Sequence, residues 1–171
     1  MKRKICVISA VLITILSIDT FGYTIINCAN GWSTCAVEKY IERIPAEMIE
    51  DYSGAIYIVP QIESDEHPMA TGLYYFDDSA IYVDEDDPAV VIHELGHHVY
   101  FTTELTDEIM RRLSAAAECY ETPPHSPFGP SQYMPEVFAY MFTDYYLDRL
   151  NDAQRDRFEE VLEEICKRRG I

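Results

Sequence analysis

The sequence predicts an α+β fold, with strands in the first half of the chain and mostly helices in the second half. Three short runs at 55–59, 72–76 and 80–83 are rich in the aliphatic and aromatic residues typical of strands. From residue 90 onward the apolar residues recur with helical spacing instead. A chain of 171 residues in this order suits one α+β domain with a substantial core.

The strand runs have clear boundaries. Run 55–59 is apolar and ends at Pro60, which favours a short buried strand. Three polar residues separate runs 72–76 and 80–83, which is the signal of a hairpin. Alternation within this hairpin predicts inward-facing side chains at Tyr74, Phe76, Ile81 and Val83.

Helices are expected on both sides of these strands. The first begins near Cys35, and residues 46–52 are expected to add about two helical turns after Pro45. Residues 122–132 contain four prolines and a glycine, so they are expected to form a loop. The later helices are expected around 90–101, over 106–121, from Tyr133 or Pro135 onward, and from an Asp152 cap to about Arg168.

The N-terminus has the pattern of a secretory signal peptide. Three basic residues precede an apolar stretch at 5–18, which is too short for an ordinary membrane-spanning helix. Thr20 and Gly22 are small residues suited to cleavage before Tyr23. We therefore expect a signal peptide at 1–22, a single domain at 23–171, and a secreted, periplasmic or extracellular location. An uncleaved N-terminal membrane anchor is the alternative.

The cysteines are compatible with export. Cys6 would leave with the signal peptide, and four cysteines would remain, for which three pairings exist. We expect disulfides between Cys28 and Cys35 and between Cys119 and Cys166, because an oxidising compartment favours them. Free buried thiols are the alternative.

The charge excludes one class of partner. Thirteen basic and thirty acidic residues give a net charge of −17. This balance argues against a basic surface for nucleic acid or for an anionic membrane, so neither is an expected partner.

The most specific feature is the pattern His93-Glu94-x-x-His97 within V-V-I-H-E-L-G-H-H-V-Y-F. Positions i and i+4 share one face of a helix, so both imidazoles can reach one metal ion. Glu94 lies about 100° round the same helix and can contact a water on that metal. Gly96 indicates that a neighbouring element approaches the helix closely, and His98 is expected to point elsewhere as a partly buried hydrogen-bonding residue.

A catalytic zinc site needs a third protein ligand. Metzincins place a glycine and a third histidine where this chain has Tyr100 and Thr103, so that class is excluded. A carboxylate from a later helix remains, and Glu136 is the best candidate because it lies in the first turn of an amphipathic helix. The competing candidates are Glu118, Glu121 and Asp144.

With H-E-L-G-H at 93–97 and P-E-V-F-A at 135–139, the chain resembles the zincin metallopeptidases whose third ligand is a glutamate. Within them it is most similar to the small lethal-factor-like and Pro-Pro-endopeptidase-like enzymes, over roughly residues 55–142. The resemblance implies a zincin-like fold, in which a small mixed sheet packs its edge strand on the helix of the motif. That edge strand, here 80–83, would hold an extended substrate by main-chain pairing.

The resemblance also implies a tyrosine that steadies the oxyanion. The family's position for it, seven residues before the glutamate, is Gly129 in this chain. Tyr133 is the nearest substitute, and Tyr140 lies behind it.

Together these features predict a zinc-dependent metalloendopeptidase that hydrolyses peptides or proteins. Zn²⁺ would be held by His93, His97 and Glu136, and Glu94 would act as general base toward a zinc-bound water. Tyr133 would stabilise the oxyanion. The alternative is an exported, catalytically inactive zinc-binding or interaction protein, but the intact Glu94 favours the enzyme. No stable membrane contact is expected once the signal is cleaved.

Overall fold

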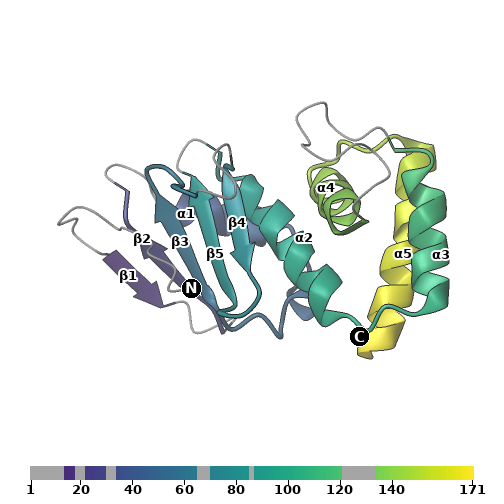
Figure 1. Ribbon diagram of the computed structural model, residues 1–171, viewed down its shortest axis with the longest axis horizontal. Coiled ribbons are helices and arrows are strands. Elements are labelled where there is room, and N and C mark those ends of the chain that lie inside the picture. The colour runs from purple at the N-terminus through teal and green to yellow at the C-terminus, as the bar shows by residue number, and fades with distance from the viewer. Residues whose placement is uncertain (1–13, 18–21, 30–33, 65–69, 85–86, 121–133) are drawn as a thin grey trace.

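The computed structural model describes residues 14–17, 22–29, 34–64, 70–84, 87–120 and 134–171, and its fold is α+β as predicted. Figure 1 shows the sheet at one end of the molecule, α3 and α5 at the other end, and α2 and α4 between them. The strands are β1 (Thr14–Ser17), β2 (Thr24–Asn27), β3 (Ala55–Val59), β4 (Gly72–Tyr75) and β5 (Ala80–Asp84). The helices are α1 (Thr34–Ile41), the 3-10 turn η1 (Ala46–Met48), α2 (Val90–Thr102), α3 (Asp107–Ala117), α4 (Met134–Tyr146) and α5 (Asp152–Arg169).

The described strands form one mixed sheet in the order β1-β2-β3-β5-β4. The three central strands β2, β3 and β5 are parallel, whereas β1 and β4 pair antiparallel with their neighbours at the two edges. The predicted hairpin is confirmed, since β4 pairs with β5 in a register that sets Tyr74 opposite Ile81. Ser79 closes its turn with a φ of 46°, in the left-handed region.

The expected identity of the edge strand was wrong. β5 lies between β3 and β4, because β4 folds back antiparallel onto its outer side. The interior position agrees with the full burial of Ile81 and Val83, whereas all four residues of β4 are only partly buried. The edge strand beside α2 is therefore β4, and α2 packs on both β4 and β5.

One of the inward-facing side chains was also assigned wrongly. Phe76 is 56% exposed, whereas Ile81 and Val83 are buried and Tyr74 is partly buried. β4 ends at Tyr75 and the turn begins at Phe76, so the alternation of the strand no longer applies there.

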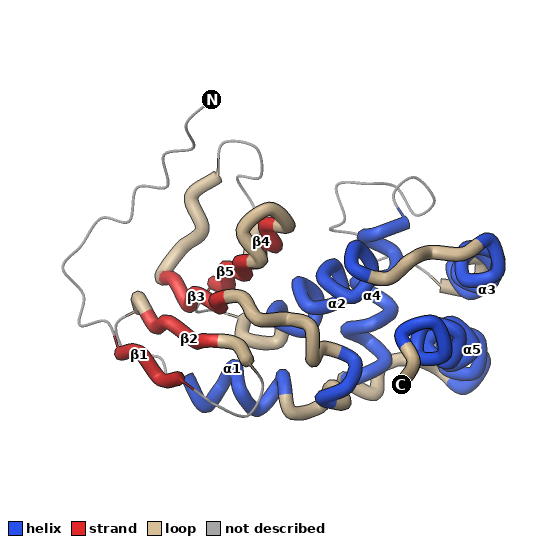
Figure 2. Tube along the Cα trace, turned by 90° about the horizontal axis from the view of Figure 1, so that it is seen from below, coloured by secondary structure: helices blue, strands red, loops and turns tan. Residues whose placement is uncertain are grey.

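The described helices that contact the sheet cover one of its faces. α1 contacts β2 and α2, and α2 contacts β4 and β5, so both lie on the same side (Figure 2). The aliphatic side chains that the sheet buries are Ile25, Ile56, Ile58, Ile81 and Val83. On the alternate positions Tyr57 and Tyr82 stack at 4.8 Å between ring centroids.

Residues 46–52 do not form the α-helix expected there. Only η1 is helical, and the following amides of Ile49 and Tyr52 bond to carbonyls three residues back, at Ala46 and Ile49. These tight turns bury Met48, Ile49 and Tyr52 together. The packing of these side chains therefore overrides the local helical pattern.

Side-chain caps begin two of the later helices. Thr106 accepts a hydrogen bond from the Ile109 amide at 3.2 Å at the start of α3. In α5 the cap is Asn151 rather than the expected Asp152, because Asn151 and Gln154 form a reciprocal capping box. α3 ends at Ala117, earlier than the 121 expected.

Residues 14–17, which lie in the apolar stretch of the predicted signal peptide, form β1 at the outer edge of the sheet. Cleavage before Tyr23 would remove β1 and leave β2, β3, β5 and β4 joined. The rest of the predicted signal, apart from Gly22, lies outside the described residues. No helix within the described ranges has the length and apolar character required to span a bilayer.

Neither predicted disulfide is present, because the four described cysteines, Cys28, Cys35, Cys119 and Cys166, form no disulfide bonds. Gln154, in the first turn of α5, donates a hydrogen bond to the Cys119 carbonyl at 3.0 Å. Cys166 lies twelve residues farther along α5, about 18 Å away at 1.5 Å per residue. A disulfide requires Cα atoms about 4.4–6.8 Å apart, so this pair is too distant.

Candidate metal centre

Helices α2 and α4 approach each other closely at Gly96. A Cβ atom on Gly96 would lie 3.0 Å from the Ala139 Cα and 3.3 Å from the Phe142 Cβ. The close approach predicted at this glycine is thus confirmed, and α4 is the neighbour. Buried Leu95 and Val99 pack α2 into the core and orient its polar face. Residues of the first turn of α4 are brought opposite this face.

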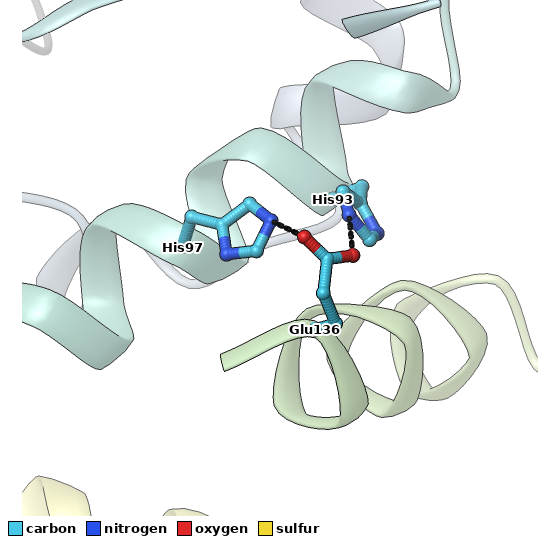
Figure 3. A group of neighbouring side chains, drawn as sticks. All are labelled: His93, His97 and Glu136. Carbon is cyan, nitrogen blue, oxygen red and sulfur yellow. Dashed lines mark ion pairs between the residues drawn. The ribbon is translucent and has the colours of Figure 1, made fainter. Parts of the chain in front are cut away.

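The polar face of α2 meets Glu136 from that first turn (Figure 3). The His93 Nε2 lies 3.4 Å from one carboxylate oxygen of Glu136, and the His97 Nε2 lies 3.2 Å from the other. One ligand atom from each of the three residues lies within 4.8 Å of the others. The side chains are 15%, 10% and 20% exposed, so the group is mostly buried but still reachable by solvent.

The two competing carboxylates that the structure describes, Asp144 and Glu118, lie elsewhere. Asp144 accepts a hydrogen bond from the Tyr120 hydroxyl at 2.6 Å, and Glu118 is exposed just beyond the end of α3. Glu121 lies outside the described residues. Among the described candidates, Glu136 is the one that contacts both histidines.

Charges within the group favour a bound cation. Burial alone would raise the pKa of Glu136, but hydrogen bonds from His93 and His97 hold the pKa of this carboxyl well below its usual range. Burial opposes a charge on His97, but the carboxylates of Glu136 and Glu94 outweigh it and raise the pKa of His97. Glu136 therefore stays ionised between the two imidazoles, which suits this mostly buried carboxylate to binding a cation.

The donor set fits a divalent metal ion. Two imidazole nitrogens and one carboxylate are a known ligand set of catalytic zinc. Donors about 2.0–2.1 Å from a tetrahedral ion lie about 3.3–3.4 Å from one another. The two histidines lie 3.4 and 3.2 Å from different oxygens of Glu136, and the three ligand atoms all lie within 4.8 Å of one another. His93, His97 and Glu136 could hold such an ion if these ligand atoms moved closer together.

Glu94 lies on the side of α2 that faces the edge strand. It is 4% exposed, and a Cβ atom on Gly72 of β4 would lie 2.5 Å from its Oε1. The backbone amide of Tyr74 donates a hydrogen bond to its carboxylate. Burial, opposed by His93 and His97 and reinforced by the charge of Glu136, raises the pKa of Glu94. The carboxylate therefore binds a proton more readily than one in water.

His98 anchors the edge strand to α2, as a buried hydrogen-bonding residue that points away from the group. Its Nδ1 lies 3.1 Å from the Tyr74 hydroxyl, and its Nε2 lies 3.1 Å from the Asp51 Oδ1. Burial lowers the pKa of His98 despite the nearby Asp51 carboxylate. A neutral ring with its proton on Nε2 satisfies both contacts, since it accepts from Tyr74 and donates to Asp51. The predicted character of His98 is confirmed.

One of the two tyrosines expected near the oxyanion lies close to the proposed ligands. Tyr133 lies outside the described residues. Tyr140 packs its ring against His93, with 4.6 Å between centroids, and is partly buried. Burial and the charges of Glu136 and Glu94 raise the pKa of Tyr140, so its hydroxyl keeps its proton.

The sequence analysis missed two neighbours of the group. Gly72 leaves room for Glu94, and Asp51 orients His98. Gly72 opens a strand-like run, where glycine is a signal of close backbone approach, so it could have been found. Asp51 had no such signal, because it lies 47 residues before His98 in a segment expected to be helical.

No family model matches the chain, and neither a curated protein nor a solved structure matches it.

Proposed function

We propose that the protein is a zinc-dependent metalloendopeptidase. The observation that carries this proposal is the convergence of His93, His97 and Glu136, with the buried carboxylate of Glu94 beside them. A pure metal site would not need a second carboxylate of raised pKa next to the ligands. Such a carboxylate is suited to receive and release a proton.

Bound zinc supplies Lewis-acid chemistry: it lowers the pKa of water toward 7 and polarises a carbonyl. Glu94 accepts the proton of the water whose oxygen attacks the scissile carbonyl carbon. It then delivers that proton to the amide nitrogen as the C–N bond breaks. The products are a new carboxyl terminus and a new amino terminus, and Glu94 is returned to its starting form.

The oxyanion requires a hydrogen-bond donor. Tyr133 is the residue suggested by sequence, and Tyr140 beside His93 is the alternative with a protonated hydroxyl close to the ligands. Comparison of Tyr133→Phe with Tyr140→Phe separates the two assignments, because only the donor's loss lowers kcat.

The substrate main chain is assigned to the outer edge of β4. This strand ends the sheet next to α2, and its inner edge is already paired with β5. An extended peptide added there would lie beside Glu94, which contacts Gly72 and Tyr74 of the same strand.

The test is cleavage of casein and of a peptide library by purified protein. We expect hydrolysis that a chelator abolishes and that added zinc restores. A protein that binds one zinc ion but cleaves neither substrate would instead support the alternative of an exported, inactive zinc-binding or interaction protein. Absence of zinc binding would exclude both functions.

We further propose that the mature protein begins at Tyr23 and is secreted. The small residues Thr20 and Gly22 before this position support the assignment. N-terminal sequencing of the protein recovered outside the cytoplasm tests it, since an uncleaved N-terminus would indicate a membrane anchor instead.

A further inference from the structure

Two exposed phenylalanines lie together beside the metal centre. Among the described residues, the large hydrophobic side chains with high exposure are Phe76 (56%), Phe101 (43%) and Ile171 (42%). Phe76 and Phe101 contact each other, with 6.1 Å between ring centroids and 67° between ring planes. We call these two residues the aromatic pair. They come from different elements, the residue after β4 and the last turn of α2.

The aromatic pair continues directly into the proposed metal ligands. Phe101 lies one helical turn after His97, and their rings stack at 6.2 Å with an interplanar angle of 24°. Phe76 also contacts Tyr74 of the edge strand, with 6.5 Å between centroids. An apolar surface therefore extends from the end of the edge strand to His97.

The fold does not depend on this exposed surface to hold β4 on α2. That contact is already made by the Tyr74 hydroxyl with His98 and by the close approach of Gly72 to Glu94 and Val90. More than half of the Phe76 side chain is open to solvent, so it contributes little to the core. Exposed aromatic groups gathered at one place are typical of a binding surface.

We propose that the aromatic pair binds a large apolar side chain of the substrate, such as phenylalanine, leucine or methionine, next to the scissile bond. This inference rests on the proposed peptidase function and adds a substrate class to it. A peptide paired with the outer edge of β4 would run past Phe76 and Phe101 within a few residues of the metal ligands. Edge-to-face and offset contacts with two phenyl rings favour aromatic and aliphatic groups over charged ones.

The experiment uses the zinc-loaded protein and a peptide library whose cleavage products are sequenced. We expect large apolar residues to be enriched at one position adjacent to the cleaved bond, on either side of it. Phe76→Ala should lower kcat/KM roughly 10- to 100-fold for a peptide with phenylalanine at that position. It should have little effect on the same peptide with alanine there. Ile171→Ala is the matched control, because Ile171 is an exposed apolar residue at the C-terminus. This change should alter kcat/KM for neither peptide.

A second measurement avoids turnover. Glu94→Gln, which would bind substrate without cleaving it, should bind the phenylalanine peptide more tightly than the alanine peptide in titration calorimetry. Adding Phe76→Ala should abolish that difference. Phe101→Leu, which keeps an apolar group beside His97, should retain zinc and much of the preference.

The outcomes separate the two proposals. Cleavage without an apolar preference, or a preference unchanged in Phe76→Ala, would overturn the role of the aromatic pair and leave the peptidase function standing. A zinc-loaded protein that cleaves no peptide would overturn both.

Discussion

The two buried carboxylates of the centre differ in their affinity for protons. Hydrogen bonds from two imidazoles lower the pKa of Glu136, whereas burial against β4 raises the pKa of Glu94. When the environments of two carboxylates move their pKa values in opposite directions, the two groups are suited to different chemical roles. Glu136 remains an anion suited to binding a cation, and Glu94 is suited to carry a proton during the proposed hydrolysis.

Replacing Glu94 by Gln should remove the general base and keep the ligands. We expect kcat to fall by about 10² to 10⁴-fold, the usual contribution of general acid–base catalysis. Zinc content measured by plasma mass spectrometry should stay at the wild-type value. Glu118→Gln, at an exposed position beyond α3, is the control and should keep full activity. Unchanged turnover in Glu94→Gln would remove Glu94 from the mechanism.

At the scale of elements, the contact between α2 and α4 brings the ligands together. It is set by Gly96, where a side chain would press on the backbone of Ala139. Sequence analysis could predict the helix and the need for close approach at Gly96, since both are local signals. It ranked Glu136 above Asp144 from its place in the first turn of the helix, but it could not predict which face of α4 packs against α2.

Gly96→Ala should therefore separate the two helices. Alanine gains roughly 1 kcal/mol in helix propensity, but overpacking typically costs about 1–3 kcal/mol. We expect a lower midpoint in urea unfolding and weaker zinc binding together. Ala115→Gly, a change in the partly buried part of α3, should lower stability without weakening zinc binding. Zinc affinity equal to wild type in Gly96→Ala would show that the contact does not control the site.

The contact between β4 and α2 should respond to acid through His98. Its pKa is lowered in the fold, so the unfolded chain takes up the proton first. The stability that neutral His98 provides is complete above its unfolded pKa of about 6.5 and is lost as the pH falls below that value. Asp51, whose burial is outweighed by His98 and Arg169, has a lowered pKa, so its contribution is lost only at still lower pH.

The pH dependence of the contribution of His98 can be measured as the free energy of unfolding of the metal-free protein from pH 8 to 5. The stability advantage of wild type over His98→Gln should shrink as the pH falls through 6. The difference between the two proteins removes the titration of the other histidines, including His97, whose raised pKa acts in the opposite direction. An advantage that is constant over this range would contradict a neutral, buried His98.

At the scale of the whole molecule, the order of strands followed by helices was predictable from the local patterns. The α+β class and the boundaries of β3 follow from apolar runs and turn residues. The strand order could not be predicted from these local patterns. β5 is an interior strand because β4 pairs with its outer side, and that pairing depends on the tertiary fold. The prediction of a disulfide between Cys119 and Cys166 was wrong for a similar reason, since it depended on an alignment of two helices that the sequence does not specify.

A chain that starts at Tyr23 should fold without β1. β1 is an outer strand that pairs with β2, and β2 keeps its parallel pairing with β3 when β1 is removed. We expect cooperative thermal unfolding and zinc binding equal to those of the longer chain. A truncated protein that remains unfolded would show that residues 14–17 belong to the domain rather than to a removable signal.

The central claim is that a carboxylate from α4 completes a metal site begun by two histidines on α2. Competitive zinc titration of wild type, Glu136→Ala and the control Asp144→Asn tests it most directly. We predict one zinc ion per chain in wild type and in the control. In Glu136→Ala we predict an affinity loss beyond the roughly 10- to 100-fold expected for an outer-shell change. Zinc binding by Glu136→Ala with the affinity of wild type would contradict the claim.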